Sequence, residues 1–224
     1  MTLPADPTAV DLDEQILLGD EAVARGAIDA GISAAYAYPG TPSTEIFQTI
    51  QSQAKALGLP VKGLWSTNEK VALEEGVGVS YAGKRAIVAM KHVGLNVAAD
   101  PFMNVAVSGA HGGLVVVVAD DPSMHSSQNE QDSRYFADFA MVPCLEPADQ
   151  QQCYDFTREA FELSERFQTP VILRLTTRIC HVKALVTVGE RVQHVAEMRQ
   201  LLFAERSAGC HHLTLTAPLA IDLV

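Results

Sequence analysis

The sequence predicts an α/β protein built on a doubly wound, mainly parallel sheet with helices on both faces. Short apolar runs alternate with helical patterns along most of the chain, as in sheets whose parallel strands are joined by crossover helices. The run Leu114–Ala119 is continuously apolar, which is typical of a central strand covered on both faces. A chain of 224 residues, 48% hydrophobic and 19% charged, can bury the core of one such domain.

The elements of the first half are bounded by capping and turn residues. Asp20 is expected to cap a helix that ends at Ala30, with Gly31 at the C′ position. The patterns that follow predict strands at 34–38 and 61–65 and helices at 43–56 and 68–81, capped by Ser43 and Asn68.

The second half continues the alternation. The patterns predict a strand at 85–90, a loop at 91–95, a helix from Asn96, and strands at 114–119 and 171–175. A helix is expected from Pro147, because the apolar positions after it follow helical spacing. The polar stretch 120–134 is expected to be a long loop, and loops of that length in compact domains are usually functional or disordered.

The chain is expected to hold one main domain, residues 1–185, followed by a weakly patterned appendage or truncated remnant at 186–224. Residues 1–15 are polar and expected to be irregular surface. Within the appendage, 192–203 has the pattern of one helix, and no clear pattern continues after it.

Composition excludes several classes of function. A net charge of −11 argues against nucleic acid and against a polybasic membrane contact. No apolar stretch is long enough to span a membrane, and the first residues lack the pattern of a signal peptide. The four cysteines have no C-x-x-C spacing, so they are expected to be reduced thiols of a cytoplasmic protein.

Two segments at predicted strand ends are candidates for chemistry. Tyr38–Glu45 contains two prolines and a glycine, which predict a rigid turn at the carboxyl end of a strand. Ligands of open α/β sheets bind at that edge. Glu69 follows the helix cap Asn68, and it is either a reactive carboxylate or a residue that stabilises the helix dipole.

These segments are two of five blocks that occur in the order of a known family. The blocks are Gly19–Gly26, Tyr38–Ser43, Asn68–Glu74, Lys91–Asn96 and Ser126–Arg134. Together they resemble the pyrimidine-binding domain of thiamine-diphosphate-dependent 2-oxoacid:ferredoxin oxidoreductases over residues 15–185. Gly40, Lys91 and His92 favour the indolepyruvate (arylpyruvate) branch, at the N-terminal part of its alpha subunit. Relatives that use pyruvate have a bulky residue at the first position and small hydroxylic residues at the other two.

The resemblance implies an enzyme component. Such a complex converts a 2-oxoacid and CoA to acyl-CoA and CO₂ and passes two electrons to ferredoxin. Pyruvate or 2-oxoglutarate as the substrate remains an alternative, as does a truncated non-catalytic remnant that only binds a partner. A thiamine site of this kind lies between two domains, so the chain is expected to be oligomeric.

The resemblance assigns the catalytic role to Glu69. A carboxylate hydrogen-bonded to N1′ of the cofactor's aminopyrimidine favours the imino tautomer, whose 4′-nitrogen then removes the C2 proton. The resemblance places Gly94, Leu95 and Asn96 at the cofactor, where Gly94 allows a close approach of the backbone.

The remaining site residues are expected at the substrate. Tyr38, Gly40 and Thr41 resemble the segment that contacts the 2-oxoacid carboxylate, and Lys91 and His92 lie at the next strand end. A cation there can neutralise a carboxylate, and a histidine can move protons near neutral pH. The alternatives are a supporting turn, a solvated lysine and a structural histidine.

The chain departs from the family in what it lacks. It contains neither a G-D-G stretch nor a C-x-x-C-x-x-C cluster. The diphosphate of the cofactor, its Mg²⁺ and any [4Fe–4S] cluster are therefore expected on a diphosphate-binding domain or subunit outside this chain. No metal site is expected within it, and the neighbouring potential ligands Cys210, His211 and His212 are interpreted as incidental.

Overall fold

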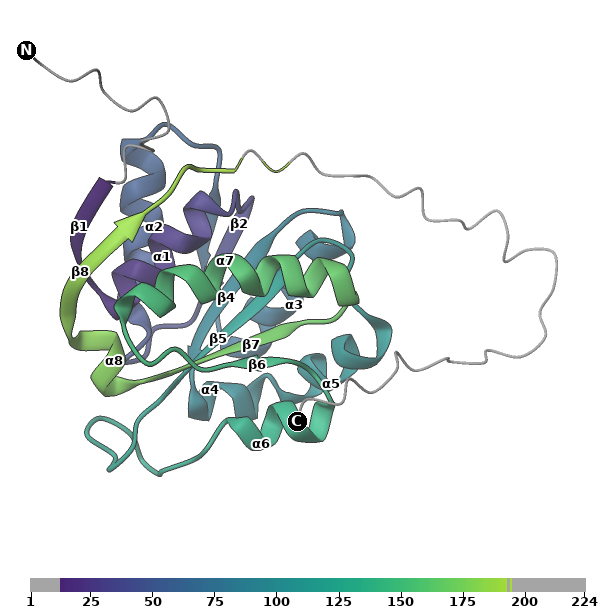
Figure 1. Ribbon diagram of the computed structural model, residues 1–224. Coiled ribbons are helices and arrows are strands. Elements are labelled where there is room, and N and C mark those ends of the chain that lie inside the picture. Colours follow the sequence, from purple (N-terminus) through teal and green to yellow (C-terminus); the bar gives the residue numbers. More distant parts are fainter. Residues whose placement is uncertain (1–12, 193, 195–224) are drawn as a thin grey trace, which may run out of the picture.

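Six parallel strands form the main sheet of the protein, which was examined as a computed structural model that describes residues 13–192 and 194. In spatial order they are β3 (Lys62–Trp65), β2 (Ala34–Ala37), β4 (Ala86–Lys91), β5 (Leu114–Asp120), β7 (Val171–Thr176) and β6 (Cys144–Leu145). Every residue of β5 is buried, as the apolar run predicts for a central strand. The predicted doubly wound, mainly parallel sheet is confirmed (Figure 1).

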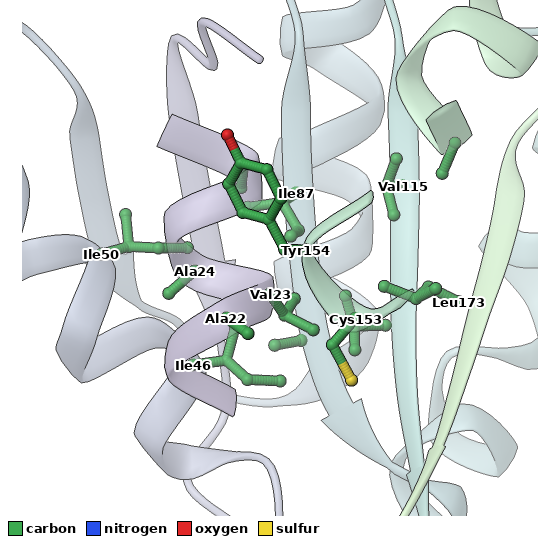
Figure 2. Close-up of a cluster of buried hydrophobic side chains, with 14 of the residues drawn as sticks. Ala22, Val23, Ala24, Ile46, Ile50, Ile87, Val115, Cys153, Tyr154 and Leu173 are labelled. Carbon is green, nitrogen blue, oxygen red and sulfur yellow. The ribbon is translucent and has the colours of Figure 1, made fainter. Parts of the chain in front are cut away.

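Helices cover both faces of this sheet (Figure 1). One face carries α1 (Gly19–Asp29), α2 (Thr44–Ala56), α7 (Gln150–Phe167) and the short α8 (Thr177–His181). The other carries α3 (Glu69–Tyr81), α4 (His92–Val97), α5 (Ala99–Ser108) and α6 (Arg134–Ala140). The core of the first face, shown in Figure 2, joins Val23 of α1, Ile46 of α2 and Tyr154 of α7.

A glycine sets the spacing of α1 and α7. A Cβ at Gly26 would lie 2.6 Å from the carbonyl oxygen of Tyr154, which is closer than real Cβ atoms approach. Only glycine permits this packing without a shift of the backbone. The predicted end of α1 is also confirmed, because Gly31 has a φ of +76° after the C-cap Ala30.

The observed starts of the helices agree with the sequence predictions in some cases and differ in others. Asn68 caps α3 as predicted, and its side chain accepts the Val71 N–H at 3.0 Å. The prediction for Asp20 is wrong, because α1 begins at Gly19 and the Asp20 oxygens accept no hydrogen bond from the described residues. The hydroxyl of Ser43 donates back to the Gly40 carbonyl instead of capping α2. Helix α7 begins at Gln150 with Asp149 as its cap, three residues after Pro147.

An antiparallel ribbon lies beside the main sheet and was not predicted. It pairs β1 (Asp13–Leu18) with β8 (Lys183–Val188), in a register that joins Asp13 to Val188. The last residues of the segment expected to be irregular, 1–15, are thus part of a strand. Strand β8 also crosses the expected boundary at 185, and its Val186 and Val188 are buried in the core.

Three further observations bear on the sequence predictions. Within 13–192 and 194, no helix combines the length and the hydropathy needed to cross a membrane. The described cysteines, Cys144, Cys153 and Cys180, are free thiols. The predicted helix at 192–203 and most of the appendage lie outside the described residues.

Candidate active site at the carboxyl edge of the sheet

The residues expected to be functional gather at one edge of the sheet. Strands β2 and β4 are neighbours, and their carboxyl ends lead into Tyr38–Ser43 and into His92 of α4. Helix α3 begins with Glu69 shortly after β3, which pairs with the other side of β2. The parallel topology therefore brings the segments around Tyr38, Glu69 and Lys91 to the edge where α/β proteins bind ligands.

Glu69 is held at the first position of α3 with its side chain largely enclosed. Its exposed fraction is 9%, and the structure records no hydrogen bond to its carboxylate from the described residues. The macrodipole of α3 favours a negative charge at this position. The carboxylate is thus fixed in place while its acceptor capacity stays free for a ligand.

Gly94 of α4 lies directly against this carboxylate. A Cβ built at Gly94 would lie 2.6 Å from Cγ and 2.7 Å from Oε1 of Glu69. The backbone of α4 thus reaches the carboxylate at a point where a side chain would displace it. Only glycine therefore permits this approach of α4 without moving the carboxylate.

The segment that carries Gly94 is helical, so the prediction of a loop at 91–95 is wrong. Lys91 is the last residue of β4, and α4 begins at His92. Leu95 is fully buried in the core between α3, α4 and the sheet, whereas Asn96 is exposed. Leu95 thus contributes packing through its side chain, and Asn96 offers its amide to solvent.

The turn after β2 is held by its own hydrogen bonds. Gly40 N–H donates to Thr44 Oγ1 at 2.9 Å, and the Gly40 carbonyl accepts from both the N–H and the hydroxyl of Ser43 at 2.9 Å. The peptide bond between Thr41 and Pro42 is cis. Tyr38 and Thr41 are exposed on this turn, whereas Ser43 is buried.

Lys91 connects this turn to the loop that follows β5. A Cβ at Gly40 would lie 3.0 Å from Lys91 Cδ, and Lys91 Nζ donates to the Ser126 carbonyl at 3.0 Å. The hydroxyl of Ser126 donates in turn to the carbonyl of Thr41 at 3.3 Å. Gly40, Thr41 and Lys91, expected to act together on the substrate, therefore lie together in the structure.

Asp121 organises the loop that contains Ser126. Its carboxylate accepts from the N–H groups of His125 and Ser126 and from the hydroxyls of Ser127 and Thr177, at 2.8–3.2 Å. Burial opposes ionisation, but these hydrogen bonds outweigh it and hold the pKa of Asp121 well below its usual range. Sequence reasoning missed this residue, although a carboxylate directly after a buried strand was a usable signal.

His92 also holds this loop. Its side chain is fully buried, and Nε2 lies 3.0 Å from the carbonyl oxygen of Asn129, while Nδ1 has no hydrogen-bond partner among the described residues. The imidazole therefore donates to the loop through Nε2. This contact is the structural role that the sequence left open beside a role in proton transfer.

Comparisons with known proteins identify the family of the chain. Residues 25–222 match the family described as pyruvate flavodoxin/ferredoxin oxidoreductase, thiamine diphosphate-binding. Indolepyruvate oxidoreductase subunit IorA of Pyrococcus horikoshii is 52% identical over 185 residues, which cover 83% of this chain and 28% of that subunit. The subunit from Methanothermobacter thermautotrophicus is 49% identical over the same length, covering 83% and 30%. The chain thus spans less than a third of these relatives.

More distant relatives share the same fold. The 2-oxoglutarate synthase subunit KorA of Methanothermobacter thermautotrophicus is 30% identical over 191 residues, covering 81% of this chain and 49% of that subunit. Among solved structures, the 2-oxoglutarate:ferredoxin oxidoreductase of Magnetococcus marinus has a TM-score of 0.67 at 22% identity. The match covers 86% of this chain and 35% of the chain in that structure.

Proposed function

Since the chain belongs to the thiamine-diphosphate-binding family of pyruvate flavodoxin/ferredoxin oxidoreductases, we propose that it supplies the pyrimidine-binding wall of a thiamine diphosphate site. The complete enzyme would oxidise indolepyruvate or a similar arylpyruvate with CoA and ferredoxin. Identity near 50% with indolepyruvate oxidoreductase subunits, against 30% with a 2-oxoglutarate synthase subunit, supports that substrate class. The Mg²⁺ and iron–sulfur groups are proposed to reside on partner segments.

The geometry around Glu69 carries the proposal. A largely buried carboxylate with no recorded donor among the described residues, set against a glycine that leaves room for no side chain, fits the edge of an aminopyrimidine ring. When bound, thiamine diphosphate supplies the nucleophilic carbon that attacks the 2-oxoacid. Glu69 is proposed to hold a proton between its carboxylate and the ring nitrogen that faces it. Gly94 is proposed to keep the ring within reach.

The neighbouring turn is proposed to receive the substrate carboxylate. Lys91 Nζ uses one donor on Ser126 and retains further donors, and the hydroxyl of Thr41 is exposed beside it. A cation and a hydroxyl suit the carboxylate that all 2-oxoacids share. Gly40 lets the Lys91 side chain pass close to this turn, since a Cβ at position 40 would lie 3.0 Å from Lys91 Cδ. Tyr38 and Asn96 are proposed to border the substrate and the cofactor, respectively.

The test uses the assembled oxidoreductase that contains this chain. Glu69→Gln is nearly isosteric, so the fold and most of the cofactor affinity should persist. Exchange of the cofactor's C2 proton with deuterated water, followed by NMR, should slow by about 10²–10⁴-fold, the usual worth of a positioned acid–base group. Glu74→Gln, at an exposed position of the same helix, is the matched control.

Equal exchange rates in the Glu69→Gln and Glu74→Gln enzymes would show that Glu69 serves only the helix terminus. The substrate class is tested separately, by comparing kcat/KM for indolepyruvate, pyruvate and 2-oxoglutarate in the unmodified enzyme. A preference for either of the last two would contradict the arylpyruvate assignment without affecting the role of Glu69.

A further inference from the structure

A second group of potential ligands lies on the opposite face of the sheet from α3. It consists of Asp20 in the first turn of α1, Glu45 in the first turn of α2 and His181 at the end of α8. One carboxylate oxygen of each acid and one ring nitrogen of the histidine all lie within 4.8 Å of one another. These residues come from three separate segments, so the fold creates the cluster.

Asp20 is the unusual member of the cluster. Its side chain is fully buried, and neither of its oxygens has a hydrogen-bond partner among the described residues. Glu45 Oε2 is likewise buried without a partner. Buried polar atoms are nearly always hydrogen-bonded, and a buried carboxylate without compensation is strongly destabilising. The arrangement therefore calls for a ligand with positive charge.

No lysine or arginine among the described residues pairs with Asp20. Burial raises the pKa of this carboxyl well above its usual range, and the nearby Glu45 and Glu21 raise it further. The thiol of Cys180 lies close and opposes this shift, although it completes no hydrogen bond to the Asp20 oxygens. His181 is exposed, so the cluster can be reached from solvent on that side.

We propose that Asp20, Glu45 and His181 form a binding site for a divalent transition-metal ion, with Zn²⁺ as the best match. Zinc binds carboxylate oxygen and imidazole nitrogen at about 2.0–2.2 Å, usually with three protein ligands and water at open sites. Donors of a tetrahedral ion at such lengths are about 3.4 Å apart. The donor atoms lie within 4.8 Å of one another, so the three side chains need to close by at most about 1.4 Å, the difference between 4.8 and 3.4 Å.

The donor set favours this class of ion over Mg²⁺ or Ca²⁺. Those ions prefer six or more oxygen ligands, whereas imidazole suits zinc and the neighbouring transition metals. The bound ion would join the starts of α1 and α2 to the end of α8. Since Glu45 follows the Tyr38–Ser43 turn by two residues, the ion would also anchor that turn.

The test is a titration of the full chain, freed of metal by chelation. Cys210, His211 and His212 are further potential ligands in the sequence, so a C210S/H211Q/H212Q background removes them. In this background, calorimetry should show one Zn²⁺ site, and Co²⁺ should give visible absorption bands of a site with nitrogen and oxygen ligands. Zn²⁺ should also raise the melting temperature.

Single substitutions then assign the ligands. Loss of an outer-shell partner of a metal weakens binding by about 10–100-fold, so loss of a direct ligand should cost at least as much. Asp20→Asn, Glu45→Gln and His181→Ala are each expected to do so, whereas the exposed residues changed in Glu74→Gln and His111→Gln should not matter. Asp20→Asn keeps the side-chain shape, and its own melting curve without metal shows whether it folds.

Two results would overturn the proposal. One is the absence of a Zn²⁺ or Co²⁺ signal in the background protein, which would leave Asp20 and Glu45 as a pair of acids that share a proton. The other is unchanged affinity in the Asp20→Asn and His181→Ala proteins, which would place the ion elsewhere. Neither result depends on thiamine diphosphate, so the metal site and the proposed function are tested independently.

Discussion

Gly94 lies so close to Glu69 that a single methyl group at position 94 would come within 2.7 Å of the carboxylate oxygen Oε1. The first residue of α3 and the middle of α4 are thereby fixed against each other. This contact limits where the carboxylate can lie, and the structure records no hydrogen bond to it from the described residues. A small change at position 94 should therefore act on chemistry before it acts on stability.

Gly94→Ala tests this directly. The added Cβ must push the Glu69 carboxylate aside, and a misplacement of about 1 Å can reduce a rate by about 10²-fold. We expect C2-proton exchange in the assembled enzyme to fall by that order, with an unchanged circular dichroism spectrum. Exchange at the original rate would mean that the Glu69 side chain adjusts to the added methyl group and that the contact does not determine the position of its carboxylate.

Gly78→Ala is the matched control on α3. A Cβ at Gly78 meets nothing within 4 Å, so the substitution should stabilise the chain by about 0.5–1 kcal/mol, as Gly→Ala does at an open helix position. Urea denaturation measures the gain. A loss of stability would show that position 78 has a packing role that its open surroundings do not indicate.

Asp121→Asn should destabilise the chain at neutral pH by about 1–3 kcal/mol, because charged hydrogen bonds to Ser126, Ser127 and Thr177 are weakened. The native pKa of Asp121 is lowered, so its contribution is present above the unfolded value of about 3.9 and is lost as the pH falls toward the native value. Urea denaturation at a series of pH values measures both effects.

The difference in stability between the unmodified chain and the Asp121→Asn variant should therefore shrink below about pH 4. Comparison of the two proteins at each pH cancels the contributions of all other acids. A difference that stays constant from neutral to acid pH would contradict the role of ionised Asp121 in ordering the loop.

The chain alone should show no measurable affinity for thiamine diphosphate. The diphosphate and its Mg²⁺ provide most of the anchoring of this cofactor, and the sequence has no G-D-G stretch to hold them. Calorimetry with Mg²⁺ and cofactor is the measurement. Micromolar binding would show that this chain holds the cofactor without a diphosphate-binding domain.

The face that carries Tyr38, Glu69 and Gly94 should be an interface with a diphosphate-binding partner. Tyr38 is exposed there, so Tyr38→Asp should weaken association with that partner in sedimentation experiments. Leu57→Asp, at an exposed position beyond the far end of α2, should leave association unchanged. If both variants associate normally, the interface lies elsewhere.

The sequence predicted the parallel core because that part of the fold is specified locally. The apolar run of β5, the cap Asn68 and the C′ residue Gly31 each act within a few residues. The same holds for Tyr38–Ser43 and Glu69, which follow predicted strands. Their gathering at one edge then follows from parallel topology alone.

The elements that were missed depend on partners distant in sequence. Strand β1 has an exposed, polar start and becomes a strand only because β8 pairs with it. Helix α4 contains Gly94, which lowers helix propensity, and packing of Leu95 into the core outweighs that preference. The contact of His92 with Asn129 joins residues 37 positions apart, and that of Asp121 with Thr177 joins residues 56 positions apart, beyond any local pattern.

The ribbon of β1 and β8 places the first and last strands of the described residues side by side. Asp13 and Val188 are opposite each other across the antiparallel pair, so their Cα atoms are about 5 Å apart. A short linker can therefore close the domain into a circle, and new ends can be opened at the exposed turn after α2, around Gly58. A circular permutant made in this way should keep the carboxyl edge intact. A partner chain could then be fused to the domain at the turn after α2 instead of at the ribbon.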